Sequence, residues 1–170
     1  MKKIVITGGP SSGKTTLINK LKETGYFCFD EISREIIHNQ KIIQSEKDLS
    51  FEQIVFEKRI EQFHSAKTGI QFYDRSFIDG LAYMQLNGIK VPENYLQLAK
   101  ELKYFNTVFI APFWSEIYVN DSERLENIYQ AEKIFLKLKE IYTTLGYKVI
   151  IIPKDTVSNR LQFIKDYLQC

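Results

Sequence analysis

The chain has 170 residues, of which 44% are hydrophobic and 26% are charged. This length and apolar content suit one soluble domain, residues 1–170, with a core large enough to fold without disulfides or metal ions. The 23 basic and 21 acidic residues leave a net charge of +2, which is too small to indicate a nucleic-acid partner. The first apolar run, Ile4-Val5-Ile6, is much too short for a signal peptide or a membrane span. We therefore expect a cytoplasmic protein that binds neither nucleic acid nor membrane.

Short apolar segments alternate with longer amphipathic segments along the chain. In chain order, strands rich in Ile, Val, Phe or Tyr are predicted at residues 3–7, 26–29, 70–73, 107–111 and 148–152. The spacing of apolar residues predicts helices over 51–63, 128–145 and 157–168. In the first of these helices the apolar stripe consists of Phe51, Ile54, Val55, Ile60 and Phe63. The alternation predicts an α/β fold with a parallel sheet that helices cover on both faces.

A glycine-rich loop separates the first predicted strand from a helix that begins near Gly13. Residues Gly8, Gly13, Lys14 and Thr15 fill the pattern G-x-x-x-x-G-K-[ST], and the flanking strand and helix are the context that this pattern requires. Glycines allow backbone N–H groups to point at phosphate oxygens, and the N-terminus of the following helix attracts anions. A turn that matches the pattern by chance is the alternative, which this context disfavours. The sequence therefore predicts a phosphate-binding loop.

The chemistry of this loop assigns a role to its polar side chains. We expect Lys14 to contact the β- and γ-phosphates, Thr15 to bind Mg²⁺ through its hydroxyl, and Thr16 to lie on the α-phosphate side. The predicted cofactors are ATP, with GTP as the alternative, and Mg²⁺. The predicted nucleotide-binding residues are Gly8, Gly9, Pro10, Ser11, Ser12, Gly13, Lys14, Thr15 and Thr16.

Charged residues follow the second predicted strand, in the run Asp30-Glu31-Ile32-Ser33-Arg34. Ligands of open α/β sheets bind beyond the carboxyl ends of the strands, so we expect Glu31 and Arg34 to lie beside the phosphate-binding loop. Their predicted role is contact with the phosphate acceptor or with the Mg²⁺ shell. The alternative is a helix that Asp30 caps, with an exposed ion pair between Glu31 and Arg34.

A second charged cluster follows the third predicted strand. Asp74 ends this strand, where its carboxylate can bind Mg²⁺ or accept a proton from an attacking hydroxyl. Arg75 can offer its planar set of donors to a phosphoryl group or to an anionic acceptor. The alternative is a turn in which Asp74 and Arg75 pair with each other and Ser76 caps the next helix. For Asp79 we expect a solvated carboxylate on a helix face.

Aromatic residues and an arginine follow the fourth predicted strand. Phe113 and Trp114 can stack on a planar ligand, and Arg124 can reach the γ-phosphate from a lid around residues 113–127. The alternative is an aromatic corner in which Asp121 or Ser122 caps the long helix.

Together these motifs resemble the small AAA-labelled P-loop NTPase domains related to ribosylnicotinamide kinase domains and, more distantly, deoxynucleoside and thymidylate kinases. The resemblance covers nearly the whole chain. It implies a five-stranded parallel sheet in the strand order of nucleoside and nucleotide kinases, with Asp74 near Mg²⁺ and Arg124 in a mobile lid. The segments that carry it are GGPSSGKTT, Glu31-x-x-Arg34, YDRSFIDGLAY, FNTVFIAPFWSEIYVNDSERLE and LGYKVIIIP.

Two other classes of nucleotide-binding protein fit the sequence poorly. A regulatory GTPase needs an Asn-Lys-x-Asp step after a late strand, and the sequence has none there. A remodelling AAA+ machine needs a strand that ends in Asp-Glu, whereas Asp74 is followed by Arg75.

The leading hypothesis is ATP- and Mg²⁺-dependent transfer of the γ-phosphoryl group to a hydroxyl of a small nucleoside-like metabolite. Lys14, Mg²⁺ and Arg124 would stabilise the phosphoryl charge, Arg75 would assist, and Asp74 would orient or deprotonate the acceptor. The predicted acceptor contacts are Glu31, Arg34, Asp74 and Arg75, and the predicted metal contacts are Thr15 and Asp74. The alternative is an ATPase or GTPase switch module that binds another protein.

Overall fold

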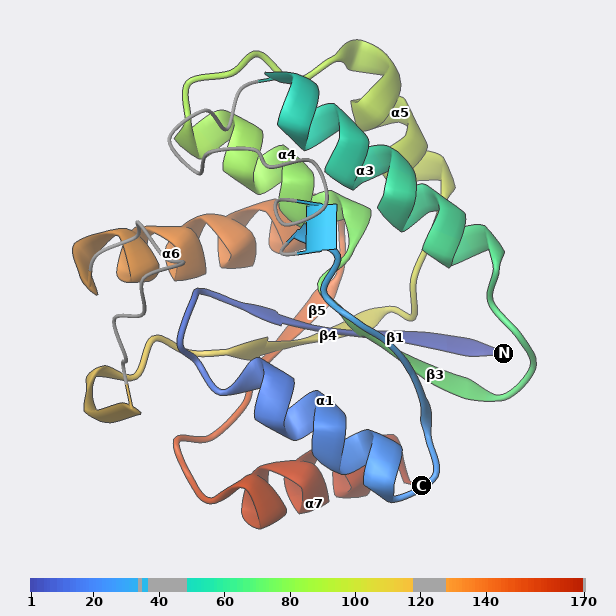
Figure 1. Cartoon of the computed structure of the whole chain (residues 1–170), viewed down its shortest axis with the longest axis vertical. Coiled ribbons are helices and arrows are strands. Elements are labelled where there is room, and N and C mark those ends of the chain that lie inside the picture. The colour runs from blue at the N-terminus through green and yellow to red at the C-terminus, as the bar shows by residue number, and fades with distance from the viewer. Residues whose placement is uncertain (34, 37–48, 118–127, 170) are drawn as a thin grey trace.

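A parallel sheet forms the centre of the computed structural model, which describes residues 1–33, 35–36, 49–117 and 128–169. Within these residues the strands are β1 (Lys2–Gly8), β2 (Phe27–Phe29), β3 (Ile70–Asp74), β4 (Thr107–Ala111) and β5 (Lys148–Ile151). They lie in the order β2-β3-β1-β4-β5, and every neighbouring pair is parallel (Figure 1). The first strand is therefore central.

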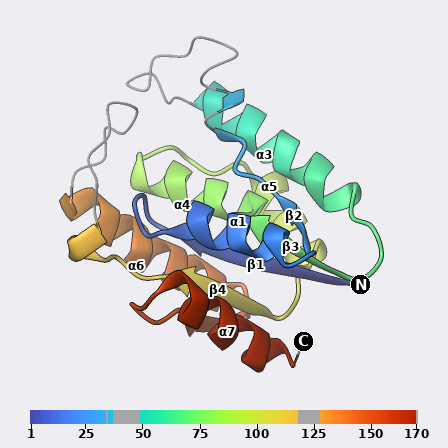
Figure 2. The same ribbon diagram turned by 60° about the horizontal axis from the view of Figure 1, so that its bottom comes forward.

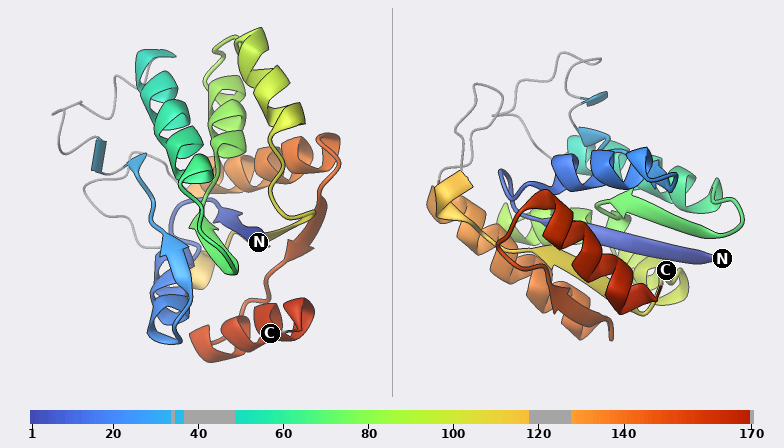
Figure 3. Two further views of the ribbon diagram at one scale, coloured as in Figure 1. Left: turned by 90° about the vertical axis from the view of Figure 1, so that its right-hand side faces the viewer. Right: turned by 90° about the horizontal axis from the view of Figure 1, so that it is seen from below.

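Helices cover both faces of this sheet. On one face lie α1 (Lys14–Glu23) and α7 (Val157–Leu168), which are side by side when the molecule is seen from below (Figure 3). On the other face lie α3 (Leu49–His64), α4 (Phe77–Leu86), α5 (Glu93–Glu101) and α6 (Ile128–Thr144), as Figure 2 shows from another side. A short 3₁₀ turn, η2 (Ser115–Ile117), follows β4.

The alternation of side chains along the strands builds a core on each face. From β1, Ile4 and Ile6 pack against Leu17 and Leu21 of α1, all fully buried. Val5 points the other way, into the core formed by α3 to α6. Burial of this much apolar surface on two faces stabilises the sheet and fixes the strand ends in space.

The register brings the carboxyl ends of three strands together. Ile6 of β1 pairs with Asp74 of β3, and Gly8 of β1 pairs with Ala111 of β4. The phosphate-binding loop therefore leaves the sheet between the ends of β3 and β4, which is where open α/β sheets bind ligands.

The predicted elements agree with the structure except in detail. The five strands and the α/β fold are confirmed, and α7 has the predicted bounds. The stripe predicted for α3 is confirmed, because Phe51, Val55 and Phe63 are buried and Ile54 and Ile60 are half-buried against the core. The helix also buries Glu52, Phe56 and Arg59, and the buried residues Phe51, Val55, Arg59 and Phe63 form a ridge at spacing four. None of the helices in the described residues combines the length and the apolar character that crossing a membrane requires.

Candidate functional site

The loop between β1 and α1 adopts a conformation that depends on glycine. Gly8 has φ 145° and Gly13 has φ 74°, both in the region that side chains disfavour. A Cβ atom on Gly8 would lie 2.4 Å from the carbonyl oxygen of Ala111, and one on Gly13 would lie 2.6 Å from Nη1 of Arg160. Strand β4 and helix α7 therefore hold the loop closely from outside, so that only glycine fits at these two positions.

Lys14 lies across this loop. Its ammonium donates to the carbonyl oxygen of Gly9 at 2.6 Å and to Oγ of Ser12 at 3.3 Å, and its side chain is buried. Burial, followed by the charge of Arg75, lowers the pKa of Lys14 to about 7. Thr15 and Thr16, in contrast, are exposed in the first turn of α1. Their hydroxyls are accessible beside the backbone N–H groups of the helix N-terminus.

Asp74 ends β3 beside this loop. It is buried, and its Oδ1 atom has no hydrogen-bond partner among the described residues. Burial and then the negative charge of Glu31 raise the pKa of Asp74 to about 6, although Lys14 and Arg75 act in the opposite direction. A carboxylate with an unpartnered buried oxygen is unusual in a native core and needs an explanation.

Glu31 holds two arginines at the end of β2. Nε of Arg75 donates to Oε2 of Glu31 at 2.9 Å, and Nη2 of Arg59 donates to Oε1 at 3.2 Å. Burial alone would raise the pKa of Glu31, but the charges of Arg75 and Arg59 lower it to about 2. Glu31 is therefore an ionised bridge between α3 and the turn after β3.

Arg59 was not predicted from the sequence to belong to this site. Its side chain is 3% exposed, and Nη1 donates to the carbonyl oxygen of Ser76 at 2.6 Å. It connects α3 to the start of α4 as well as to Glu31. The signal that could have found it is the ridge of apolar residues at spacing four in α3, which contains one arginine.

Arg75 pairs differently from the alternative in which it pairs with Asp74. It has φ 71°, and its guanidinium contacts Glu31 and, at 3.6 Å, Oδ1 of Asp79. No ion pair joins Arg75 to Asp74 within the described residues. The guanidinium also lies 5.4 Å from the ring centre of Tyr83. The turn after β3 therefore orders Arg75 through other elements and leaves Asp74 aside.

The expectation of a solvated Asp79 is wrong, because its side chain is completely buried. Oδ2 accepts from the backbone N–H of Ser76 at 2.9 Å and from the hydroxyl of Tyr142 at 2.5 Å, and Oδ1 accepts from Thr7. Ser76 caps α4, as the alternative for this turn had it, and Asp79 completes a capping box. Tyr142, which lies on α6, was not predicted to take part.

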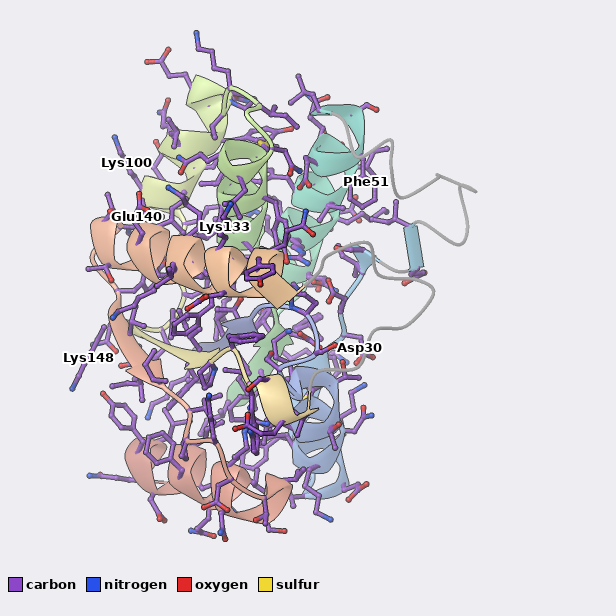
Figure 4. The ribbon with its side chains drawn as sticks, turned by 90° about the vertical axis from the view of Figure 1, so that its left-hand side faces the viewer. Asp30, Phe51, Lys100, Lys133, Glu140 and Lys148 are labelled. Carbon is purple, nitrogen blue, oxygen red and sulfur yellow. The ribbon has the colours of Figure 1, made fainter. Side chains whose placement is uncertain are left out.

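Several predicted residues lie away from this centre or outside the description. Arg34 and Arg124 lie outside the described residues, as does most of the predicted lid. Asp30 is at the molecular edge (Figure 4), where its carboxylate pairs with Lys22 at 2.5 Å. Of the lid, Phe113 and Trp114 are half-buried, and Cδ1 of Ile117 lies 3.5 Å from the position of a Cβ on Gly13.

The structure thus brings the loop and the predicted charged residues together. Lys14 interacts electrostatically with Asp74, Glu31, Arg75 and Asp79. These residues come from three separate segments of the sequence and meet at the carboxyl ends of β1, β2 and β3. The arrangement suits an anionic ligand that binds to the loop beside these carboxylates.

Solved structures of similar fold include several kinases. Deoxyadenosine kinase from M. mycoides with bound dATP is 17% identical, with a TM-score of 0.70 over 100% of both chains. Thymidylate kinase from Ehrlichia chaffeensis is 17% identical, with a TM-score of 0.68 over 99% of this chain and 98% of that one. The NadR protein in complex with NAD and AMP-PNP is 18% identical, with a TM-score of 0.76 over 99% of this chain and 50% of that one. The likeness confirms the predicted P-loop fold in nucleoside and nucleotide kinase order.

Comparison at the level of sequence gives the family. A search of curated proteins gives no match. A family model described as AAA domain matches residues 3–160, which span the sheet from β1 to β5 and the phosphate-binding loop. The chain therefore belongs to the AAA domain family.

Proposed function

We propose that the protein is a kinase that uses ATP and Mg²⁺ to phosphorylate a hydroxyl of a small nucleoside-like metabolite. The observation that carries this proposal is Asp74, a buried carboxylate whose Oδ1 atom has no partner among the described residues and which interacts with Lys14 of the loop. A carboxylate kept available beside a phosphate-binding loop has a use in phosphoryl transfer.

The residues of the loop fit a nucleoside triphosphate. The positive φ angles of Gly8 and Gly13 let backbone N–H groups of the loop point toward phosphate oxygens, and the N-terminus of α1 adds its positive dipole. A polyphosphate can replace the Gly9 carbonyl as the partner of the Lys14 ammonium. Similar structures contain dATP or AMP-PNP, which supports nucleotide use here.

The residues also fit Mg²⁺. This ion commonly takes one or two protein oxygens and completes its shell with phosphates and water, so it needs no cluster of protein carboxylates. No group of three or more His, Cys, Asp or Glu side chains forms such a cluster in the part of the chain that the structure describes. The exposed Thr15 hydroxyl and the Asp74 oxygen that has no partner among the described residues are the ligands that would bind the ion. When bound, Mg²⁺ would neutralise charge on the transferring phosphoryl group.

The protein side of the reaction then rests on position and charge. Asp74 would orient the acceptor hydroxyl or take its proton, and Lys14 would stabilise the phosphoryl oxygens. Glu31 and Arg75 would contact the acceptor, since the ends of β2 and β3 bring them beside Asp74. Contacts from Arg34 and Arg124, which lie outside the described residues, stay predictions.

A screen of purified protein tests the proposal. ADP formation is measured with ATP or GTP and Mg²⁺ against nucleosides, deoxynucleosides, nicotinamide riboside, nucleoside monophosphates and other hydroxyl metabolites. A Lys14→Ala variant is the blank. A kinase transfers γ-labelled phosphate to one class of acceptor at a rate far above acceptor-free hydrolysis.

Tight nucleotide binding without any acceptor-stimulated turnover would contradict the kinase proposal. That result would favour the switch module, whose hydrolysis rate would respond to a protein partner instead. The labelled product also identifies the acceptor. Label that appears in free phosphate alone indicates hydrolysis instead.

A further inference from the structure

Arg160 of α7 lies directly behind the phosphate-binding loop. Its side chain is 2% exposed, and Nη2 donates to the carbonyl oxygen of Ser12 at 3.0 Å. Its other terminal nitrogen, Nη1, lies where a side chain on Gly13 would otherwise stand. The last helix therefore contacts the loop at the peptide between Ser12 and Gly13, immediately before Lys14.

This contact fixes the direction of one peptide group. In a trans peptide the C=O and N–H groups point in opposite directions, and none of the described peptide bonds is cis. The Ser12 carbonyl points outward to Arg160, so the N–H of Gly13 points to the opposite side, into the loop. That N–H is one of the donors with which such a loop binds a phosphate oxygen.

The charge of Arg160 has no counter-charge among the residues that the structure describes. No ion pair joins its guanidinium to another residue that the structure describes, and its Nε atom is buried without a hydrogen-bond partner. A buried cation is costly unless an opposite charge lies close by. The phosphate-binding loop is the place next to Arg160 where a multiply charged anion would bind.

We propose that Arg160 is a positioning residue for nucleotide binding. It orients the Ser12–Gly13 peptide toward the phosphates, and its positive charge is neutralised by the bound polyphosphate. This inference rests on the proposed function, because it needs the loop to bind a nucleotide.

The test compares two variants of α7 in titrations with ADP and Mg²⁺. Arg160→Met keeps the length of the side chain but removes the donors and the charge. Ile164→Ala is the matched control, since Ile164 is completely buried in the core next to α1 and is not part of the loop. Affinity is measured by calorimetry, and the Tm is recorded with and without ADP.

Arg160→Met is expected to weaken ADP binding about tenfold, which corresponds to about 1.4 kcal/mol. The Tm without ADP is expected to fall less than in Ile164→Ala, because a buried unpaired charge is removed. Ile164→Ala is expected to bind ADP as the wild type does, despite its lower Tm. If ADP affinity instead fell together with the Tm in both variants, loss of stability alone would explain the weaker binding of Arg160→Met. That result would overturn the inference.

Two further comparisons make the outcome unambiguous. If Arg160→Met does not fold, Arg160→Lys takes its place, with a loss of ADP affinity of roughly threefold expected and wild-type affinity contradicting the inference. If the wild type binds ADP no better than Lys14→Ala, the proposed function fails and the inference fails with it. If the wild type binds ADP and Arg160→Met binds it equally well, the inference alone fails.

Discussion

Asp74 and Asp79 stand on either side of the Arg75-Ser76 turn, and both carboxylates are buried. The fold treats them differently. Asp79 receives hydrogen bonds from β1, from the start of α4 and from α6, whereas Oδ1 of Asp74 receives none among the described residues. The pKa of Asp74 rises to about 6 because burial disfavours its charge.

This contrast indicates that Asp79 stabilises the structure of the site, whereas Asp74 is available to a ligand. Removal of a saturated carboxylate leaves several donors unpaired and destabilises the fold. Removal of a buried carboxylate that lacks hydrogen-bond partners instead relieves the desolvation cost of its charge. Buried acidic residues beside the same loop can therefore be distinguished by their partners alone.

The largest effect is expected from Lys14→Ala. The contrast between Asp74 and Asp79 assumes that a phosphate lies beside Asp74, and Lys14 is the residue that would bind this phosphate. We expect turnover to fall to the limit of detection and ATP binding to be lost, as the ammonium is the loop's only side-chain cation between residues 8 and 16. Equilibrium binding and ADP release measure this. Lys20→Ala, on the exposed face of α1, is the control that should behave as wild type. Unchanged affinity in Lys14→Ala would remove the phosphate from the site.

Asp74→Asn is expected to lower phosphoryl transfer by a factor of about 10² or more, the usual cost of losing a general base. The free energy of unfolding at pH 7 is expected to stay the same or to increase, since a neutral amide needs less solvation than a buried carboxylate. Single-turnover transfer and urea unfolding measure the two quantities. Near-normal transfer, or a large loss of stability, would mean that Asp74, like Asp79, stabilises the fold rather than takes part in the reaction.

The pH dependence sharpens the same point. The folded-state pKa of Asp74, about 6, lies above its usual value of 3.8, so its contribution to stability is present below pH 3.8 and is lost as the pH rises through 6. Glu31, with a pKa lowered to about 2, contributes in the opposite sense, since its contribution is present above pH 4.5 and is lost as the pH falls through 2. Between about pH 3.8 and pH 6, therefore, the stability of Asp74→Asn should increase relative to the wild type, and above pH 6 the difference should stay constant.

Activity should follow the same ionisation. If transfer needs ionised Asp74, kcat/KM of the wild type falls below pH 6 with a slope of one proton. It should also fall above pH 7 as Lys14, whose pKa is lowered to about 7, loses its proton in the free protein. The acid limb should be missing in Asp74→Asn, and its persistence there would assign the limb to another group.

The effect of Asp79→Asn is expected to fall mainly on stability, by about 3 kcal/mol, because the amide cannot accept all the hydrogen bonds that reach this buried carboxylate. Turnover per folded molecule should stay within about tenfold of wild type. Urea unfolding followed by circular dichroism gives the first value.

Tyr142→Phe removes one donor to Asp79 and the hydrogen bond between this hydroxyl and Oγ of Ser76, and should cost about 1 kcal/mol, the smallest effect among these substitutions. The same urea unfolding measures it. If Asp79→Asn were as stable as the wild type but inactive, Asp79 rather than Asp74 would be the residue on which the chemistry depends.

The sequence predicted the features that depend on local pattern. The bounds of α7 and the strand at residues 107–111 follow from spacing and residue type alone, and the phosphate-binding loop follows from a pattern of adjacent residues. Their physical cause lies within a few residues of chain, so a short window contains it.

The supporting contacts depended on distant parts of the chain. The step from Ser76 to Asp79 does carry the spacing of a capping box, but only α6 and β1 explain why this carboxylate is fully buried. Arg160 reaches Ser12 from the other end of the sequence, and although its spacing from Val157 and Ile164 puts it on the apolar side of α7, no local pattern indicates that it contacts the loop. Tertiary packing, not propensity, assigns these residues to the site.

The turn that follows β4 has an optical consequence. Trp114, the one tryptophan of the sequence, directly precedes η2, whose Ile117 approaches Gly13 of the loop. Indole emission therefore comes from a single residue, which lies three residues before the Ile117 contact with the phosphate-binding loop. The unlabelled protein contains its own fluorescent reporter, so a shift in emission wavelength on addition of nucleotide can follow binding in real time.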